Sequence, residues 1–531
     1  MANSRPLGAQ ISHMLKDRGI DVIFGIPGVH NQEMYRGIEE AGITHVLARH
    51  EQGAGFMADC YARASGKPGV AYVITGPGLC NTMTPMGQAY SDSVPLLVIS
   101  SCLDETAGKR GQLHQMKDQR GAAATVCDWS EEAGTAAAAY TLIDRALAEF
   151  KTQRPRSKHI QVPISVLEAT TAAAPAAPAA PVSALHLDHH TMNRIEQALA
   201  QAQYPVFVLG GGARQGSANM FAILRRTGAL AITTYAGRGI VDGSDERCLG
   251  AILARPQSAN IMEEADLVVA IGTELAEVDL WRDQLGHICP MIRVDIDPAV
   301  LATVGPDDMA VHCQSQTFYN DLFSRLEDWD QDKPFLWDRD RVTRQAAAFR
   351  AEINAERPGI VRVCDALRNA VPAGTMIYSD MTQLAYTAKE VWDMDRPGHW
   401  HHPTGFGTLG YATPAAIGGA VARKGKPTMA IIGDYGFHYT MAELGVAVEL
   451  GLSIPIILWD NTKLGEIEDS MVRAQIAPNA VIARNPDFCK VAEAFGAHSV
   501  APKTLDDMQT AVRAAFDAGG PTLIYLTPAI A

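Results

Sequence analysis

The chain has 531 residues, enough for three or four domains of roughly 150 residues each. It is 47% hydrophobic and 20% charged, a balance typical of folded globular proteins rather than disordered or fibrous ones. The formal net charge of −14 argues against nucleic acid or an anionic membrane as the main partner.

The N-terminus and the cysteines bear on location. No apolar run reaches the roughly 20 residues needed to cross a bilayer, and the N-terminus lacks the apolar core of a signal peptide. No two of the nine cysteines are closer than 20 residues, so paired metal or redox motifs are absent, and an odd count fits poorly with a disulfide framework. We expect a cytoplasmic protein with reduced thiols.

Short apolar runs ending in turn residues alternate with helical patterns along the whole chain. They lie at 21–28, 71–78 and 95–101, then at 205–212, 265–272 and 291–298, and finally at 375–380, 428–434 and 453–461. Apolar strands between helices predict parallel sheets covered on both faces. The predicted fold is therefore α/β, with three doubly wound parallel-sheet domains and ligand sites at the carboxyl ends of the strands.

Two stretches separate the three blocks. The Ala/Pro run TTAAAPAAPAAP at 170–181 cannot build a core, and a charged stretch with Pro334 follows at 327–341. We expect an N-terminal domain at 1–169, a linker at 170–182, a central domain at 183–330, a linker at 331–350 and a C-terminal domain at 351–531.

Two neighbouring strands of the third block end in polar residues. Asp434 and Asn461 are 27 residues apart, which leaves room for one crossover helix at 440–451. Oxygen ligands at one sheet edge suit Mg²⁺, and Gly436 lets phosphates approach the helix that follows. The competing interpretation is that Asp434 caps a helix and Asn461 caps a turn, but the matched strand ends favour the ion site.

The segment GDYGF at 433–437, followed by Asn461, resembles the cofactor motif of thiamine-diphosphate enzymes, in which GDG precedes a pair of asparagines. Tyr435 replaces the second Gly of that motif, and Asp460 replaces the first Asn. The resemblance implies these cofactor contacts: Mg²⁺ on Asp434, Asn461 and the carbonyl of Lys463, the diphosphate beside Tyr435 and Gly436, and further contacts from Thr382 and Gln383.

Other segments extend this resemblance over the whole chain. Residues 154–167, 294–298 and 484–497 resemble the acetolactate synthase, pyruvate oxidase and 2-oxo-acid decarboxylase branch. The three domains are then a pyrimidine-binding, a central Rossmann-like and a diphosphate-binding domain. The family also implies a homodimer with active sites at the subunit interface, commonly assembled into a homotetramer.

The segment ARHEQGAGFMADCYAR at 48–63 resembles the family segment whose Glu hydrogen-bonds N1′ of the aminopyrimidine. Here that residue is Glu51, and such a carboxyl favours the tautomer that removes the thiazolium C2 proton. The alternative interpretation is an acid at a helix N-terminus. A zinc HExxH motif is excluded because position 54 is Ala.

The segment TGFGTLGYATPAAIGG at 404–419 resembles the family turn that bends the cofactor into a V. Leu409 would lie beneath the two rings, and the carbonyl of Gly407 would accept from the 4′-amino group. The bend brings the reacting atoms together by packing alone. Without the resemblance, the segment is a Gly-rich strand-to-helix turn.

The central block contains VFVLGGGARQG at 206–216, which only partly matches a dinucleotide-binding turn. Gln215 occupies the position of the third Gly in GxGxxG. The acidic run typical of FAD-binding acetolactate synthases is missing as well. We therefore expect thiamine diphosphate and Mg²⁺ as cofactors, no FAD, and a structural role for this domain.

Three segments, at 25–31, 110–116 and 464–468, should line the substrate end of the site, and each of their candidate residues could instead be structural or exposed. The expected substrate and catalytic residues are Ile26, Pro27, Gly28 and His30 in the first segment, His114 and Gln115 in the second, and Glu466 and Glu468 in the third. His402, in the histidine-rich run at 399–402, is a further candidate for the substrate end and could equally belong to a structural loop. Histidine is the natural proton donor near neutral pH. Extra carboxylates would favour a substrate with a cationic side chain.

The favoured function is non-oxidative decarboxylation of a 2-oxo acid to an aldehyde and CO₂. LHQMKDQ and LGEIED resemble segments of decarboxylases for 5-guanidino-2-oxopentanoate (2-ketoarginine), so a basic side chain is favoured. The first alternative is a flavin-free carboligase resembling acetolactate synthase. The remote alternative is a non-catalytic scaffold subunit, which is disfavoured because Glu51 and the metal pair are both present.

Overall fold

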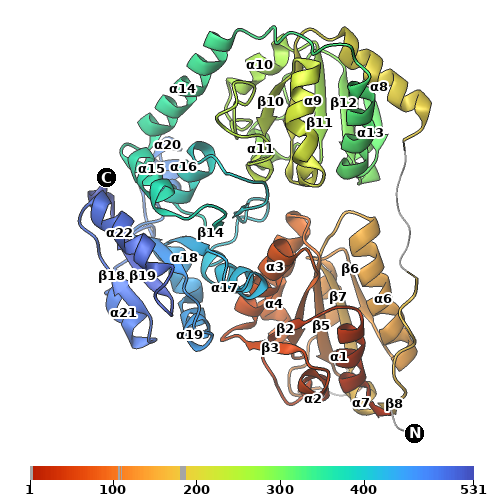
Figure 1. The fold of residues 1–531 in the computed structure, drawn as a ribbon. Coiled ribbons are helices and arrows are strands. Elements are labelled where there is room, and N and C mark those ends of the chain that lie inside the picture. Colours follow the sequence, from red (N-terminus) through yellow and green to blue (C-terminus); the bar gives the residue numbers. More distant parts are fainter. Residues whose placement is uncertain (1–3, 106–107, 109, 180–186) are drawn as a thin grey trace. The chain divides into compact units, whose positions relative to one another are not determined.

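The structure is a computed structural model that describes residues 4–105, 108, 110–179 and 187–531. The chain alternates strands and helices (Figure 1) and contains three main sheets. Residues 180–182 of the predicted first linker and 183–186 of the predicted central domain lie outside the described residues.

The first sheet has six parallel strands in the order β3-β2-β4-β5-β7-β6. Its strands are β2 (Val22–Gly25), β3 (Thr44–Leu47), β4 (Gly69–Val73), β5 (Leu96–Cys102), β6 (Trp129–Glu132) and β7 (Lys158–Pro163). The helices are α1 (Leu7–Asp17), α2 (Gln32–Glu40), α3 (Glu51–Ser65), α4 (Pro77–Ser91), α5 (Gln119–Ala124), α6 (Ala136–Thr152) and α7 (Ile164–Glu168). Apolar side chains of α1, α2 and α6 form one core with the sheet.

The second sheet has five parallel strands in the order β10-β9-β11-β12-β13. Its strands are β9 (Pro205–Leu209), β10 (Leu230–Thr233), β11 (Leu267–Ile271), β12 (Met291–Asp295) and β13 (Met309–His312). Its helices are α8 (His189–Gln201), α9 (Met220–Thr227), α10 (Ser258–Glu264), α11 (Glu277–Leu280), α12 (Pro298–Leu301), α13 (Ser315–Glu327) and α14 (Arg339–Glu356), with 3-10 turns η1 (Gly211–Arg214), η2 (Ser217–Asn219) and η3 (Tyr235–Gly237). Helix α15 (Ile360–Ala370) follows α14 and directly precedes the first strand of the third sheet.

The third sheet has the order β15-β14-β16-β17-β19-β18. Its strands are β14 (Met376–Ser379), β15 (Trp400–His401), β16 (Thr428–Gly433), β17 (Pro455–Trp459), β18 (His498–Val500) and β19 (Thr522–Leu526). The helices are α16 (Gln383–Val391), α17 (Ala412–Ala422), α18 (Asp434–Thr440), α19 (Leu444–Glu449), α20 (Gly465–Arg473), α21 (Phe488–Ala494) and α22 (Leu505–Ala515), with turns η4 (Met441–Glu443) and η5 (Pro528–Ile530). These sheets confirm the predicted α/β class.

The described chain forms two compact units. The first unit contains the described residues up to 179 together with 377–382 and 402–530, and the second contains 187–376, 383–401 and the last residue, Ala531. Within the first unit, α17 packs closely on α3, because Gly418 has no side chain to collide with the Met57 carbonyl. This contact fixes the helix that begins at Glu51.

Both predicted linkers contain regular structure. Thr170–Thr171 forms β8, which pairs antiparallel with β1 (Arg5–Pro6). Part of the predicted 331–350 linker forms the start of α14, and its Val342 and Phe349 are buried in a core with the second sheet. The domain boundaries themselves stay predictions.

The crossover between β16 and β17 differs from the single helix expected at 440–451. It consists of α18, η4 and α19. The helix is interrupted because Thr440 leaves helical geometry, with φ −136° and ψ 17°, while its hydroxyl donates to the Gly410 carbonyl over 2.8 Å. The interruption turns Glu443 into the interior.

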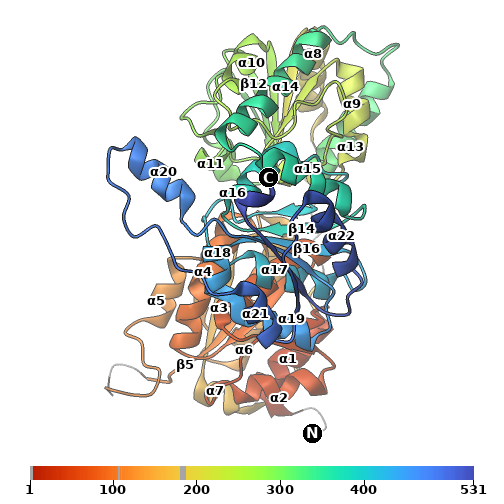
Figure 2. The same ribbon diagram turned by 90° about the vertical axis from the view of Figure 1, so that its left-hand side faces the viewer.

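Helix α20 projects away from the third sheet (Figure 2), and Gly465 is its one buried residue. Among the described residues, no helix combines the length and apolar character required to traverse a bilayer.

Candidate active site

Glu51 is the first residue of α3, directly after the turn that leaves β3. The His50 side chain caps this helix by accepting a hydrogen bond from the Gln52 amide at 3.1 Å. The Glu51 Oε2 atom accepts from Nδ2 of Asn81, on α4, at 2.8 Å. Glu51 is therefore both the helix-start acid and an oriented carboxylate, so the two sequence interpretations are compatible.

Glu443 supports the start of α3 and was missed by the sequence analysis. It is 1% exposed, and its Oε1 atom accepts from the backbone amides of Arg49 and His50 at 3.1 and 2.8 Å. A side chain on Gly53 would collide with this carboxyl group. Burial raises the pKa of Glu443 to about 7, against the lowering effect of the two amide hydrogen bonds. The sequence offered one signal for it, because Glu443 is an acidic residue within the largely apolar segment that follows GDYGF.

His30 and His114, expected at the substrate end, lie together. Their ring centroids are 5.0 Å apart in an edge-to-face arrangement. The Nδ1 atoms of both rings are buried without a hydrogen-bond partner in the described chain. Burial, followed by the neighbouring His114, lowers the pKa of His30.

The turn at the start of α4 connects this histidine pair with Glu51. A side chain on Gly76 would collide with the His114 carbonyl, and a Cβ on Gly78 would lie 3.5 Å from the Glu51 Oε1 atom. Gly76 has φ +69°, and His114 itself has φ +64°, a left-handed conformation that is strained for a residue with a side chain. The turn from Gly76 to Gly78 therefore lies against both His114 and Glu51, two of the predicted catalytic residues.

The predicted cofactor turn at 404–410 is held by buried polar contacts. Gly407 and Gly410 have φ +69° and +83°, and the Gly410 amide donates to Asp380 over 2.8 Å. Burial raises the pKa of Asp380 to about 7, opposed by backbone hydrogen bonds. Leu409, expected under the cofactor, is half-buried.

Asp434 lies at the predicted metal edge. Gly433 and Trp459 are paired across β16 and β17, which brings Asp434 and Asp460 next to each other at the strand ends. The Asn485 Nδ2 atom donates to Asp434 at 2.7 Å and to Asp460 at 2.8 Å. Burial, with a smaller contribution from Asp460, raises the pKa of Asp434 to about 6.

The loop after β17 contains the other predicted metal ligands. The Lys463 amide donates to the Asn461 side-chain oxygen at 3.3 Å, and Thr462 between them has φ +58°. The Lys463 ammonium forms an ion pair with Glu468, a predicted substrate residue. Glu466, the other predicted acid, lies in the first turn of α20.

The residues at this edge fit Mg²⁺ and a diphosphate group. Asp434, Asn461 and the Lys463 carbonyl supply oxygen atoms, which Mg²⁺ prefers. Two buried carboxylates, Asp434 and Asp460, concentrate negative charge that a divalent cation would neutralise. Gly436 lies where a side chain would approach Asp380 to 2.6 Å, so the backbone beside Tyr435 is kept close to the sheet edge.

The remaining predicted residues are distributed as follows. Thr382 is buried against Gly433, and Gln383 begins α16. Gln115 accepts from the Gln112 amide at 3.3 Å, and His402 is buried and shares a hydrogen bond with Ser379 at 2.9 Å.

Ile26, Pro27 and Gly28 follow β2, and the Gly28 amide donates to Asn31 at 2.7 Å. Glu51 and Asp434 belong to two separate hydrogen-bonded groups, one with Asn81 and one with Asn485.

The glycine run of the central domain has a packing explanation. Side chains on Gly210 or Gly212 would collide with the backbone of Gly272, in the turn after β11. The two turns therefore approach each other too closely for any other residue. This close approach supports the predicted structural role of the domain, which stays a prediction.

The sequence as a whole matches three family models. These are the N-terminal TPP binding domain of thiamine pyrophosphate enzymes at 5–122, the central domain at 192–322 and the C-terminal TPP binding domain at 380–526. The chain belongs to the thiamine pyrophosphate enzymes, as its motifs predicted.

Its relatives cover nearly the full chain. It is 40% identical to a probable 2-ketoarginine decarboxylase of Pseudomonas aeruginosa, over 99% of this chain and 94% of that protein. It is 27% identical to the acetolactate synthase isozyme 2 large subunit of Escherichia coli, over 98% of this chain and 95% of that protein. It is 26% identical to an acetolactate synthase large subunit of Haemophilus influenzae, over 94% of this chain and 90% of that protein.

Proposed function

We propose that this enzyme decarboxylates a 2-oxo acid with a cationic side chain, of the 2-ketoarginine class, to an aldehyde and CO₂. The proposal is carried by the contact between His30 and His114 beside the Glu51 turn. The chain's 40% identity to a probable 2-ketoarginine decarboxylase supports the substrate class.

Thiamine diphosphate, when bound, supplies the nucleophilic carbon that adds to the 2-oxo group and holds the electron pair left when CO₂ departs. Glu51 would hold a proton at the aminopyrimidine N1′, with its carboxyl oriented by Asn81. Asp434, Asn461 and the Lys463 carbonyl would hold Mg²⁺. The backbone beside Tyr435 and Gly436 would lie against the diphosphate.

The histidine pair would deliver the proton that completes the aldehyde. Both buried Nδ1 atoms lack a partner in the described chain, so neither ring is tied to a structural hydrogen bond at that atom. The lowered pKa of His30 keeps this ring neutral near pH 7, so it can accept a proton from His114 or pass one to it. Such a donor near neutral pH suits aldehyde formation.

The acids of α20 would recognise the cationic end of the substrate. Glu466 is the first choice, because it lies in the segment LGEIED that resembles decarboxylases of this substrate class, and Glu468, which forms an ion pair with Lys463, is the second. Glu466 lies in the first turn of a helix that projects from the third sheet (Figure 2). A carboxylate there would attract a guanidinium group and repel an anionic side chain.

Exposed apolar residues beside the site support a homodimer. Val29 and Leu113, adjacent to the two histidines, are 60% and 61% exposed. Ile467 and Val472 on α20 are also exposed. Apolar surface of this kind marks contact surfaces, so we propose that a second subunit covers it and that two dimers form a tetramer.

The nine free cysteines support a reducing, cytoplasmic location.

A panel of 2-oxo acids tests the reaction. The purified chain with thiamine diphosphate and Mg²⁺ should release CO₂ from 2-ketoarginine with a higher kcat/KM than from pyruvate or 2-oxoglutarate. A preference for pyruvate with an acetohydroxy acid as product would instead show a carboligase, the activity named for the acetolactate synthase relatives.

A non-catalytic scaffold is tested separately by thermal unfolding. Thiamine diphosphate with Mg²⁺ should raise Tm, because a ligand that binds the native state stabilises it. No rise in Tm together with no turnover of any 2-oxo acid would support the scaffold.

A further inference from the structure

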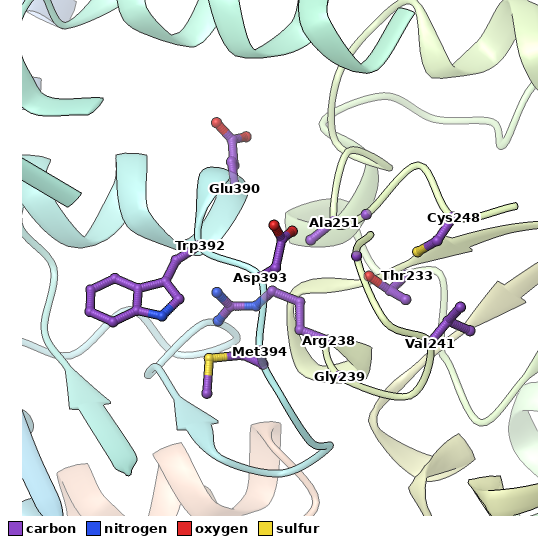
Figure 3. A pocket seen from close by; sticks show the side chains of 12 residues that line it. Thr233, Arg238, Gly239, Val241, Cys248, Ala251, Glu390, Trp392, Asp393 and Met394 are labelled. Atoms are coloured by element: carbon purple, nitrogen blue, oxygen red, sulfur yellow. The ribbon is translucent and has the colours of Figure 1, made fainter. Parts of the chain in front are cut away.

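The second compact unit contains a small pocket that the proposed reaction does not use (Figure 3). Its walls come from residues 233–251, which begin at the last residue of β10, and from 390–394, which include the end of α16 and the residues after it. The cavity volume is about 20 Å³. That space holds one or two water-sized species and is far too small for a nucleotide.

Arg238 is the unusual residue in this pocket. Its side chain is 6% exposed, and its Nε atom donates to the Tyr235 carbonyl over 3.0 Å. The two remaining nitrogens, Nη1 and Nη2, are buried and have no hydrogen-bond partner in the described chain. Figure 3 shows the guanidinium group among the labelled side chains of Trp392, Asp393 and Met394. Buried polar groups without partners are rare because they are costly in free energy.

The two carboxylates that line the pocket, Glu390 and Asp393, form ion pairs with arginines other than Arg238. Glu390 accepts from the Tyr235 hydroxyl at 3.0 Å and forms an ion pair with Arg255. Asp393 pairs with Arg368 at 3.1 Å. Neither carboxylate is hydrogen-bonded to Arg238, so its charge has no direct counterion among the described residues.

The arginine is nevertheless held in one position and keeps its charge. Its Cζ atom lies 4.5 Å from the centroid of the Trp400 ring, a stacking contact that leaves the edge of the guanidinium free. Burial lowers the pKa of Arg238 to about 9, so the group is still a cation at neutral pH. The result is a fixed, buried cation that lines a small cavity and has two donor atoms without a partner among the described residues.

We propose that this pocket binds a small monovalent anion between Nη1 and Nη2 of Arg238. The planar fork of a guanidinium suits two-point binding of one anion. The cavity volume limits the ligand to a halide or a one-carbon oxyanion such as formate or bicarbonate. Val241 and Met394 supply apolar wall, which strengthens the attraction between the two charges.

The pocket is preformed by close packing on one side. Gly239 has φ +82°, and a side chain there would collide with the backbone of Arg396. A side chain on Gly243 would likewise collide with Asp393. The bound anion would neutralise Arg238 between these two packed segments, so its binding would stabilise the folded state.

Thermal unfolding of the full chain with thiamine diphosphate and Mg²⁺ tests the site. Sodium chloride, bromide, formate and bicarbonate are each titrated against sodium gluconate at constant ionic strength, because gluconate is too large for the cavity. At least one small anion should raise Tm saturably, and the anion with the lowest midpoint identifies the ligand. An unchanged Tm with all four would overturn the proposal.

Variants assign the effect to Arg238. Arg238→Gln should lose the saturable rise, and Arg238→Lys should shift its midpoint at least tenfold, because a lysine lacks the fork. The exposed Arg344→Gln in the same unit is the matched control and should behave like the native chain. A saturable rise that persists unchanged in Arg238→Gln would contradict the assignment.

Crystallography decides the question even if Arg238→Gln fails to fold. Crystals of the native chain grown in bromide should show an anomalous peak within hydrogen-bond distance of both Arg238 Nη atoms. Ordered water at that position, with no anomalous signal, would show that solvent satisfies the arginine and would overturn the proposal. Neither readout depends on decarboxylation, so failure here is distinguishable from failure of the proposed function.

Discussion

The imidazole rings of His30 and His114 meet edge to face with their centroids 5.0 Å apart, although 84 positions separate them in the sequence. The pair lies next to the Gly76–Gly78 turn that also borders Glu51. This relationship connects the histidine pair, our proposed proton donor, with the residue expected to activate the cofactor, and it underlies the first prediction.

His114→Gln should lower kcat/KM for decarboxylation by roughly 10²–10⁴-fold, the range for loss of a general acid. It should leave the rise in Tm caused by thiamine diphosphate and Mg²⁺ intact. Steady-state kinetics and thermal unfolding measure the two effects. His190→Gln, an exposed residue of α8, is the matched control and should retain full activity. Equal activity of the two variants would remove His114 from the mechanism.

Glu51→Gln should abolish most turnover, because a neutral amide cannot hold the exchangeable proton needed at the aminopyrimidine. We expect a loss of at least about 10²-fold in kcat/KM, measured as CO₂ release. Glu39→Gln changes an exposed acid of α2 and should have no effect. A fully active Glu51→Gln enzyme would be incompatible with the proposed role.

Asp434→Asn should weaken the cofactor's metal anchor without unfolding the chain. The rise in Tm with thiamine diphosphate should require Mg²⁺ in the native chain and should be reduced or lost in the variant. Removal of the metal with EDTA should have the same effect on the native enzyme. Asp517→Asn, at an exposed position, provides the control. A Mg²⁺-dependent rise of native size in Asp434→Asn would place the metal elsewhere.

Glu443 should make stability depend on pH. Its folded-state pKa is about 7, raised from 4.5 by burial, so the folded state binds this proton more tightly than the unfolded state. The contribution of this proton to the free energy of unfolding is fully present below about pH 4.5 and is lost as pH rises through about 7. The total loss is at most about 3 kcal/mol.

Thermal unfolding of the native chain and of Glu443→Gln across about pH 5 to 8 measures this contribution. Buried Asp380 titrates in the same direction, so only the difference between the two proteins is assigned to Glu443. The native Tm should fall more steeply with rising pH than that of the variant. Glu449→Gln, at an exposed acid, should keep the native slope. Parallel curves for the native chain and Glu443→Gln would contradict the prediction.

Glu466→Gln should reduce the preference for cationic over neutral 2-oxo acids. We expect roughly a tenfold or larger fall in the kcat/KM ratio, the size of one charge-assisted hydrogen bond. Asp469→Asn, on the same helix and exposed, tests whether charge near α20 is sufficient by itself. An unchanged ratio in Glu466→Gln would remove this residue from substrate recognition.

Much of the fold could be predicted because its signals are local. Apolar runs such as 428–433 are bounded by turn residues and became strands at the expected places. Asp434 and Asn461 follow strands that pair directly, so their neighbourhood could be inferred from chain order and parallel pairing. The family resemblance was confirmed by the three matching domains.

The rest depends on contacts between distant segments. Glu443 accepts from the His50 amide, 393 positions away, and no local pattern encodes that hydrogen bond. Asn485 joins Asp434 to Asp460 from a separate loop. No sequence pattern distinguishes Arg238. Its lack of a direct counterion follows only from the structure, in which Glu390 and Asp393 pair with other arginines.

The central claim is tested most directly by the products formed from 2-ketoarginine. Purified enzyme with thiamine diphosphate and Mg²⁺ should convert it to equal amounts of CO₂ and 4-guanidinobutanal, followed by gas release and proton NMR in one sample. Condensation of two substrate molecules with loss of one CO₂, or no reaction while pyruvate gives acetolactate, would contradict the account.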